Sequence, residues 1–406
     1  MPDSTWNVRV IAAGAEPALA GEMRLAGCSE AGIERMAPKA EGMALALEQV
    51  DAAAANLLKQ EMLAVGGDAA LAHETWAGGP AATGLVLVGT RLQFETLLVG
   101  LGGAPRGVPE IGRAIAEALE HHSRRRFELD LAGRVLVVGP APALMGIVNV
   151  TPDSFSDGGE CFDTAPAVAR AVEQAGAGAD ILDIGGESTR PGSESVGEDE
   201  ELRRVIPVIE KLAGRVDVPI SIDTRRGRVA REAIAAGARI INDVSGLQGE
   251  SEVAAAAADT GAAVVIMHML GQPRTMQVSP RYDNVMADIC RYLRAGMDLA
   301  RQAGIRENRI IVDPGIGFGK RLEHNLEVLA RLGQMRSLGR PILVGPSRKQ
   351  FIGELTGVET PAARTFGTAA ACAMAVAAGA LILRVHDVGP MREAVKVAAA
   401  IAAERN

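Results

Sequence analysis

The sequence is poor in aromatic residues, cysteine and positive charge, and it has no apolar run long enough to cross a membrane. Aromatic residues make up 3% of the 406 positions. The core must therefore be filled by Ala, Val, Leu and Ile, as in parallel α/β proteins whose strands are covered on both faces. The formal net charge of -8 argues against a nucleic-acid partner, which normally requires a basic surface.

The four cysteines are widely scattered and show no C-x-x-C spacing, so neither a zinc site nor a redox pair is expected. They are Cys28, Cys161, Cys290 and Cys372. The first residues, MPDSTWNVRV, lack a basic segment before an apolar one, so we expect no signal peptide and a cytoplasmic protein. The longest apolar stretch, 368–383, falls short of the ~20 residues of a membrane span. It predicts a buried helix that stops at Gly379 and a buried strand.

Short apolar runs and longer helical stretches alternate from about residue 143 onward. Eight runs are typical of strands: LMGIVNV, DILDIGG, PISIDT, RIINDVSG, AVVIMHM, RIIVDPG, PILVGPS and LILRVHDV. Segments with helical spacing lie between them, at 165–177, 226–236, 282–303 and 361–378. Several helices are predicted to end in glycine, at Gly178, Gly237, Gly304 and Gly379.

Eight such units in about 260 residues predict an α/β protein with a (β/α)8 TIM barrel over residues 139–406. An open, doubly wound sheet is the alternative. Polar residues follow nearly every strand, which favours the barrel, because barrels place their chemistry at the carboxyl ends of the strands. An open sheet would gather polar residues at one switch point.

Residues 1–138 predict an additional small α/β domain of unknown function. NVRVIAAG and TGLVLVG are typical of strands, and 42–65 is interpreted as one amphipathic helix. The domain contains no Walker motif and no G-x-G-x-x-G. The segment FELDLAGRVLVVGPAP, 127–142, predicts a hairpin that closes the bottom of the barrel.

The first two strands of the barrel open into long polar loops. NVTPDSFSDGG begins with Asn149, whose amide oxygen suits a Mg2+ ion held mainly by water and substrate phosphate; Asp153 and Asp157 could assist. A turn-forming Asn is the alternative. GGESTRPG, 185–192, combines glycines with a hydroxyl and a guanidinium and suits an anion, although Glu187 and Arg190 could simply pair with each other.

Three later strands end in acidic or amide side chains: Asp223, Asn242 with Asp243, and Asp313. A buried carboxylate can accept two adjacent protons from a flat heterocycle that carries a ring N–H beside an amine. Each residue taken singly could instead cap the following helix.

Glycines and cations follow the last three strands. The glycines of DPGIGFGK permit a close approach of backbone to a flat ligand. Phosphate sites of barrels often follow strands seven and eight, where Lys349, Arg384 and His386 fall. Lys349 and His386 could also be surface or structural residues, and His268 is expected to be a supporting or core histidine.

Seven segments in this order resemble the dihydropteroate synthase family of pterin-binding enzymes: MGIVNVTPDSFSDGG, DIGGESTRPG, SIDT, INDVSG, DPGIGFGK, GPSRK and RVHD. The resemblance covers about residues 143–403, and the first two segments are long and specific. It implies a transferase of folate biosynthesis that condenses (7,8-dihydropterin-6-yl)methyl diphosphate with p-aminobenzoate, assisted by Mg2+. It also implies a target of sulfonamides.

The resemblance implies roles for individual residues. Asn149 would contact Mg2+ and the diphosphate, and Thr189, Arg384 and His386 would bind the diphosphate. The pterin would be held by Asp223, Asn242, Asp313, Lys349 and Gly345, with Met267 and Phe318 lining its pocket. The loops with Phe155, Thr189, Arg190 and Pro191 would complete the p-aminobenzoate site with Lys349. The catalytic group would be Asn149, Asp223, Lys349, Arg384 and His386.

Three alternatives remain at this point: a corrinoid-linked pterin methyltransferase, a methanopterin-type synthase with another arylamine, and a binding or scaffold protein with a relic barrel. The methyltransferase would have little use for the Mg2+–diphosphate loop or for GPSRK. The expected partners are small-molecule substrates and a second copy in a homodimer, with neither nucleic acid nor membrane. The N-terminal ~140 residues lie outside the resemblance.

Overall fold

The structure is a computed structural model that describes residues 16–72, 82–105, 107–150, 164–187, 196–271 and 275–404. It divides into two compact units, Met1–Glu120 with Ile401–Asn406, and His121–Ala400. The division falls earlier in the chain than the expected boundary at 138/139. The reason is that the hairpin at 127–138 packs with the second unit.

The N-terminal unit is a three-stranded antiparallel sheet with helices, in the strand order β1-β3-β2. Its core contains Leu58, Met62, Leu87 and Phe94, all fully buried. The elements are α1 (Glu16–Leu25), α2 (Glu30–Met36), the 3-10 helix η1 (Ala37–Lys39), β1 (Gly42–Asp51), α3 (Ala52–Ala64), β2 (Asp68–Leu71), β3 (Ala82–Thr90), α4 (Arg91–Leu101) and α5 (Val108–Ser123), which continues into the second unit.

The prediction of one helix over 42–65 is wrong, because β1 occupies its first half and α3 the second. Met43, Leu45 and Leu47 alternate with exposed residues, which is the period of a strand. Asp51 then begins the helix by accepting hydrogen bonds from the Ala53 and Ala54 N–H groups. β3 confirms the strand predicted from TGLVLVG, whereas NVRVIAAG lies outside the described residues.

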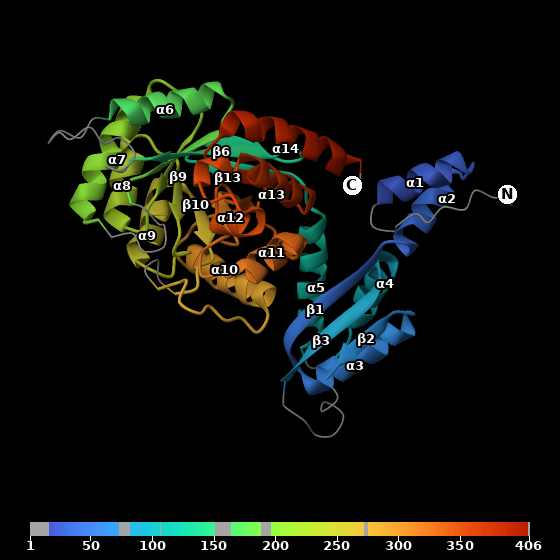
Figure 1. The fold of residues 1–406 in the computed structure, drawn as a ribbon. Coiled ribbons are helices and arrows are strands. Elements are labelled where there is room, and N and C mark those ends of the chain that lie inside the picture. Colours follow the sequence, from blue (N-terminus) through green and yellow to red (C-terminus); the bar gives the residue numbers. More distant parts are fainter. Residues whose placement is uncertain are drawn as a thin grey trace. The chain divides into compact units, whose positions relative to one another are not determined.

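The second unit alternates strand and helix and forms a barrel (Figure 1). After the β4 (Phe127–Leu131) and β5 (Arg134–Val138) hairpin, its strands are β6 (Ala143–Asn149), β7 (Ile181–Gly185), β8 (Ile220–Asp223), β9 (Ile240–Asp243), β10 (Ala263–Met267), β11 (Ile310–Asp313), β12 (Leu343–Val344) and β13 (Ile382–Val385). Its helices are α6 (Ala165–Gly176), α7 (Glu198–Ala213), α8 (Gly227–Ala236), α9 (Ser251–Thr260), α10 (Val285–Gln302), α11 (Leu322–Ala330), α12 (Gln350–Thr356), α13 (Thr365–Ala377) and α14 (Val388–Ala403), with 3-10 turns η4 (Glu307–Arg309), η5 (Leu332–Leu338) and η6 (Pro361–Ala363).

These strands form an eight-stranded sheet in the order β11-β10-β9-β8-β7-β6-β13-β12. All its neighbouring strands are parallel where pairing is recorded. A parallel bridge between Val312 and Ile342 joins the two ends of the order and closes the barrel. The eight strands expected from the sequence, and the barrel fold class, are thereby confirmed. No helix in the described ranges is long and apolar enough to cross a membrane.

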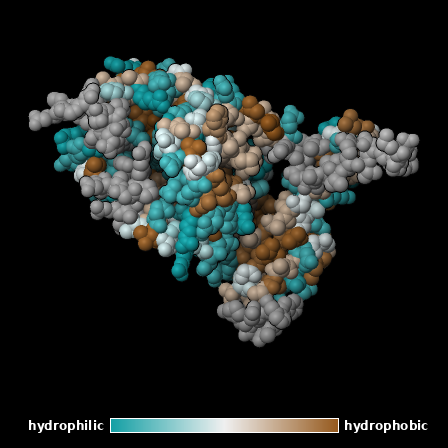
Figure 2. Space-filling view, viewed as in Figure 1, coloured by the Kyte–Doolittle hydropathy of each residue, from teal (hydrophilic) through white to brown (hydrophobic). Residues whose placement is uncertain are grey.

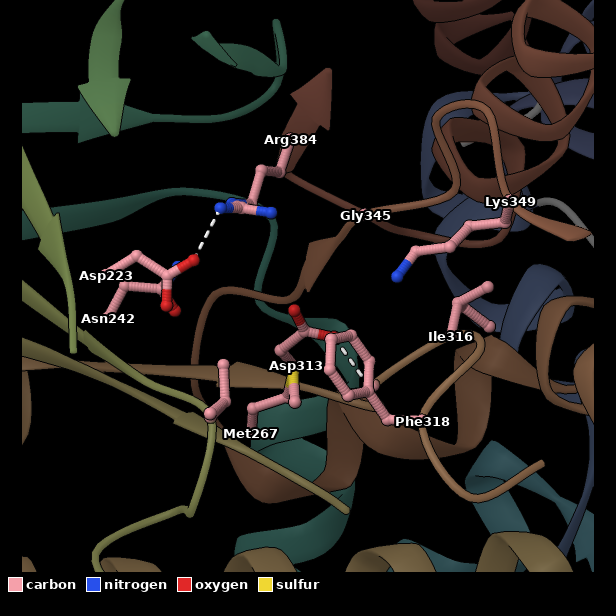
Figure 3. A pocket seen from close by; sticks show the side chains of 11 residues that line it. Asp223, Asn242, Met267, Asp313, Ile316, Phe318, Gly345, Lys349 and Arg384 are labelled. Atoms are coloured by element: carbon pink, nitrogen blue, oxygen red, sulfur yellow. Dashed lines mark hydrogen bonds and ion pairs between the residues drawn. The ribbon is translucent and has the colours of Figure 1, made fainter. Parts of the chain in front are cut away.

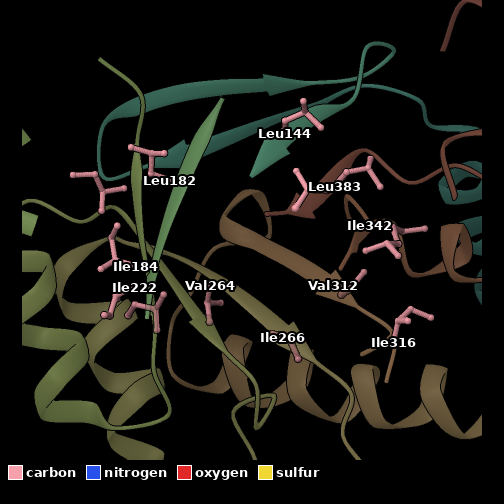
Figure 4. Packing of buried hydrophobic residues seen from close by; sticks show 14 of the residues in the cluster. Leu144, Leu182, Ile184, Ile222, Val264, Ile266, Val312, Ile316, Ile342 and Leu383 are labelled. Carbon is pink, nitrogen blue, oxygen red and sulfur yellow. The ribbon is translucent and has the colours of Figure 1, made fainter. Parts of the chain in front are cut away.

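The alternation of side chains along each strand produces two apolar layers. Leu182, Ile184, Ile222 and Val264 belong to the large cluster that also includes the apolar faces of the helices (Figure 4). Residues one position away, such as Ile181, belong to a separate cluster with side chains of the other strands. The helices turn polar side chains outward, and Figure 2 shows a largely hydrophilic surface over α10.

The β4–β5 hairpin covers the amino ends of the barrel strands, as predicted. Leu129, Leu131 and Val138 are buried in the inner cluster together with Ala143, from the start of β6. Asp130 anchors the hairpin to η4 by accepting from Arg309 Nη2 at 2.8 Å. The amino end of the barrel is therefore sealed by apolar side chains, which leaves its carboxyl end for a ligand.

Candidate active site

Polar side chains from four strands meet at the carboxyl end of the barrel. Asp223 ends β8, Asn242 lies in β9, Asp313 ends β11 and Arg384 lies in β13. Figure 3 shows these side chains around one pocket. Its lining is Asp223, Asn242, Val244, Met267, Asp313, Gly315, Ile316, Phe318, Gly345, Lys349 and Arg384.

Eight of the predicted substrate-binding residues therefore line one pocket: Asp223, Asn242, Met267, Asp313, Phe318, Gly345, Lys349 and Arg384. The sequence analysis did not assign Val244 or Ile316 to the site, whereas Gly315 is one of the DPGIGFGK glycines that it expected close to a flat ligand. Val244 and Ile316 adjoin motifs that were recognised, but apolar positions carry no chemical signal before the loop geometry is known.

A buried ion-pair network organises one side of the pocket. Arg384 donates from Nε to Asp183 Oδ2 at 2.6 Å and from Nη2 to Asp223 Oδ2 at 2.7 Å. Asn242 Nδ2 donates to the same Asp183 oxygen at 3.0 Å. Asp183 is completely buried, and the sequence analysis did not single it out. Its signal was a lone acid between apolar residues of a barrel strand.

Two pocket carboxyls resist ionisation because they are buried. Burial raises the pKa of Asp223 to about 7; Arg384 opposes this rise and the charge of Asp183 adds to it. Burial likewise raises the pKa of Asp313 to about 6, against the hydrogen bond that Asp313 Oδ1 accepts from the Gly315 N–H at 2.6 Å. Both carboxyls therefore change charge near neutral pH, so the charge of the pocket depends on pH.

The turn after β12 directs Lys349 toward the pocket, opposite Asp223 (Figure 3). Arg348 in this turn has a φ of 60° and is held by a bidentate ion pair with Asp387, with Nη2 to Oδ1 at 2.6 Å. Arg364 donates from Nη1 to the carbonyls of Arg348 and Lys349 at 3.0 and 3.2 Å. Lys349 Nζ lies 4.2 Å from the centre of the Phe318 ring, a cation–π geometry.

The loop after β11 is held from beneath by Lys320, whose side chain is buried. Its Nζ lies 2.9 Å from His268 Nδ1, and it donates to the carbonyls of Gly315 and Phe318 at 2.9 and 3.1 Å. Burial, with help from Lys320, lowers the pKa of His268 to about 2, so the neutral ring accepts this bond. His268 is a buried supporting residue, as expected, and the sequence analysis gave no role to Lys320.

Asn149 and His386 do not line the pocket, although both are at strand ends. Asn149 is half-buried and pairs in register with Gly185, which pairs in turn with Asp223. His386 is held through its N–H and Nδ1 by the Ser347 hydroxyl, at 3.2 and 3.0 Å. Their roles toward a ligand stay predictions.

The predicted loop residues Phe155, Thr189, Arg190 and Pro191, as well as Asp153 and Asp157, lie outside the described residues. Glu187 is described, and it pairs with Arg226 at 3.1 Å and with Arg225 at 3.6 Å.

Residues 145–386 match the model of a family described as pterin binding enzyme. The chain belongs to this family. A dihydropteroate synthase of Synechocystis sp. is 48% identical over 263 residues, which is 65% of this chain and 91% of that protein. Among solved structures, a Xanthomonas albilineans dihydropteroate synthase with 4-aminobenzoic acid is similar in structure, with a TM-score of 0.64 and 48% sequence identity. The match covers 68% of this chain and 99% of that one.

The match to one further relative extends beyond the barrel. A probable bifunctional folylpolyglutamate synthase/dihydropteroate synthase of Haloferax volcanii is 42% identical over 355 residues, which is 85% of this chain and 42% of that protein. The 85% of this chain that is covered is longer than the barrel unit, His121–Ala400, so the match includes part of the N-terminal unit. The extension is therefore not peculiar to this chain.

Proposed function

We propose that the chain is a dihydropteroate synthase. It would condense (7,8-dihydropterin-6-yl)methyl diphosphate with p-aminobenzoate to give 7,8-dihydropteroate and diphosphate. The observation that carries the proposal is the convergence of Asp223, Asn242, Asp313, Lys349 and Arg384 on one pocket. Relatives of the same family that match the whole barrel carry this activity in their names.

The pocket chemistry suits a pterin. Asp313 and Asp223 can each accept N–H protons from a ring nitrogen and an exocyclic amine. Met267 and Phe318 are largely buried in one small cluster and offer apolar surface to a flat ring. Lys349 supplies a cation beside Phe318, where it can donate to a ring carbonyl or nitrogen.

A Mg2+ ion would be held at Asn149. The described residues contain no cluster of three or more His, Cys, Asp or Glu able to hold a metal. A half-buried amide oxygen at a strand end nevertheless fits an ion that takes most of its ligands from water and substrate phosphate. When bound, Mg2+ would stabilise negative charge on the departing diphosphate.

The chain's own residues would promote departure of the diphosphate. Arg384 and His386, on β13 and just after it, would bind the leaving oxygens, so that the C–O bond breaks early and leaves a cationic pterin methylene. Asp223, held by Arg384, would stabilise this cation. The arylamine nitrogen is already nucleophilic, so positioning supplies much of the remaining effect and no strong base is required.

The p-aminobenzoate site would be completed by the loops with Phe155, Thr189, Arg190 and Pro191, together with Lys349. Sulfonamides, which share the aniline group, would compete at this site. We further propose that the chain acts in the cytoplasm as a homodimer, which sedimentation at micromolar concentration would test.

Product analysis with several acceptors tests the proposal against the corrinoid-linked methyltransferase and the methanopterin-type synthase. The chain is supplied with the pterin diphosphate, Mg2+ and either p-aminobenzoate or an alternative arylamine. The proposal predicts dihydropteroate formation that a sulfonamide inhibits competitively with p-aminobenzoate. Preference for another arylamine would instead support the methanopterin-type synthase. No condensation with any arylamine, together with methyl transfer from an N-methylated pterin to an added corrinoid in a parallel assay, would support the methyltransferase.

A further inference from the structure

We propose that Asp183 is a positioning residue that decides which end of the Asn242 amide faces the ligand and fixes the Arg384 guanidinium. This inference rests on the proposed function and names a residue that acts through two others. Asp183 does not itself line the pocket, whereas both of its partners do. It lies in β7, and its partners lie in β9 and β13.

The hydrogen bonds leave one orientation for the amide. A carboxylate has acceptors and no donor, so Asn242 must turn its Nδ2 toward Asp183, at 3.0 Å. The amide oxygen then remains as the polar end that Asn242 can offer to a ligand. Asn and Gln are normally ambiguous in this respect, and here the buried carboxylate removes the ambiguity.

The same oxygen orients Arg384. With Nε on Asp183 at 2.6 Å and Nη2 on Asp223 at 2.7 Å, the planar guanidinium is held at two points by two strands. Two fixed contacts on a planar group leave it little freedom to rotate. Asp183 therefore orders one donor and one acceptor group of the pocket at once.

Stability alone does not account for an acid at this position. Asp183 is 0% exposed, and its Oδ1 has no hydrogen-bond partner within the part of the chain that the structure describes. A buried carboxylate with an unsatisfied oxygen lowers the stability of the fold, and an apolar residue at the same position often gives a fold that is at least as stable. The flanking Leu182 and Ile184 are apolar and buried.

The orientation has a consequence for specificity. Asn242, Asp223 and Asp313 would all present oxygen acceptors, so the preferred ligand edge carries N–H and NH2 donors. A ring with acceptor atoms at those positions would place its lone pairs opposite the acceptor oxygens of the pocket. Such a ring would be rejected, since a buried unpaired polar group is strongly unfavourable.

The test compares Asp183→Ala with the matched control Ser221→Ala, because an Asn at position 183 would keep an oxygen able to accept both hydrogen bonds. Ser221 pairs with Asp183 in register on β8, is equally buried, and also has an oxygen without a partner among the described residues. No hydrogen bond links it to Asn242 or Arg384 in that part of the chain. Kinetics give KM for each substrate, calorimetry gives Kd for the pterin diphosphate with Mg2+, and thermal unfolding checks that each variant is folded.

We expect Asp183→Ala to raise the KM and Kd for the pterin substrate by about tenfold or more, the scale of one well-placed buried hydrogen bond to a charged group. The KM for p-aminobenzoate should stay within about twofold. Ser221→Ala should leave all three constants within about twofold. Folded Asp183→Ala with unchanged pterin constants would overturn the inference, as would an equal loss in Ser221→Ala.

A reversed pair, Asp183→Asn with Asn242→Asp, keeps the hydrogen bond and again leaves an oxygen for the ligand. This double variant should bind the pterin at least about threefold more tightly than a second double variant, Asp183→Asn with Asn242→Ala, which has no side-chain oxygen at position 242. Equal affinities would overturn the amide-orientation argument even if the single variant does not fold. Failure of the unmodified chain to bind the pterin would instead count against the proposed function.

Discussion

At the scale of single residues, the pocket depends on two carboxyls that lie buried at the carboxyl end of the barrel. Asp223 and Asp313 are both largely buried, and burial raises the pKa of each toward neutrality. Ligand N–H groups would replace the water that these acids lack. The sequence located both residues, because an acid directly after an apolar strand is a local signal.

Replacement of Asp313 by Ala is expected to abolish measurable pterin binding, because the ring N–H and amine would lose their shared acceptor. Loss of a hydrogen bond to a charged group costs about 1.5–3 kcal/mol, and two such bonds would be lost. Calorimetric titration with the pterin diphosphate measures the effect. Asp259→Ala, at an exposed acid of α9, is the control. Unchanged affinity in Asp313→Ala would refute the role.

The raised pKa values predict a pH-dependent stability. Each acid titrates at about 6 or 7 in the folded chain and near 3.8 when unfolded, so the folded state holds more protons between these values. Their contribution to the free energy of unfolding is complete below pH 4 and is lost as the pH rises through 6 to 7. Relative to the double variant Asp223→Asn with Asp313→Asn, the free energy of unfolding of the unmodified chain should fall by on the order of 6 kcal/mol from pH 4 to pH 8. Urea denaturation at each pH measures the free energy of unfolding, and an equal change with pH in the two proteins would contradict this prediction.

At the scale of elements, the strands and helices of the barrel were predictable, whereas the loops were not. The alternation of eight apolar runs with helical stretches gave every barrel strand. Lys320 was missed, because its role comes from carbonyls that approach it only when the loop after β11 is folded. The helix expected over 42–65 failed because alanine-rich sequence is compatible with both helix and strand, and the period-two burial of β1 decided the outcome.

Gly315 illustrates the loop constraint and gives a prediction at this scale. It has a φ of 65°, and a Cβ there would lie 2.0 Å from the His268 carbonyl oxygen. Gly315→Ala should therefore displace the loop beneath the pocket, weaken pterin binding by tenfold or more, and destabilise the fold by about 3 kcal/mol.

Gly304→Ala is the matched control, because its φ is 88° and nothing lies within 4 Å of the added Cβ. It should cost only about 1 kcal/mol of backbone strain and leave pterin affinity unchanged. Equal effects of the two substitutions in calorimetry and thermal unfolding would show that the close approach to His268 is unimportant.

At the scale of the whole molecule, the chain joins a barrel to an N-terminal unit with a core of its own. The sequence separated the two parts and predicted that the hairpin at 127–138 closes the barrel, although the expected boundary at 138/139 left the hairpin outside the barrel domain. Its apolar residues complete the inner cluster of the barrel. The hairpin, which covers the end of the barrel opposite the pocket, is therefore part of the folding unit of the barrel.

A fragment of residues 121–406 is accordingly expected to be soluble and to bind the pterin, while a fragment of residues 140–406 should be destabilised. The shorter fragment would expose Met145 and Ile181 beneath the missing hairpin, and each fully buried large apolar side chain contributes about 1.5–3 kcal/mol. Circular dichroism melting curves of the two fragments provide the comparison. Equal melting temperatures would show that the hairpin is dispensable.

The convergence of Asp223, Asp313 and Lys349 on one pocket at the carboxyl end of the barrel predicts that the chain joins a pterin to an arylamine there. The reaction of the full chain with the dihydropterin methyl diphosphate, Mg2+ and p-aminobenzoate, followed by mass spectrometry, measures this directly. Dihydropteroate and diphosphate should form in equal amounts, and Asp313→Ala should give neither product. No dihydropteroate from the unmodified chain, or undiminished product from the variant, would contradict it.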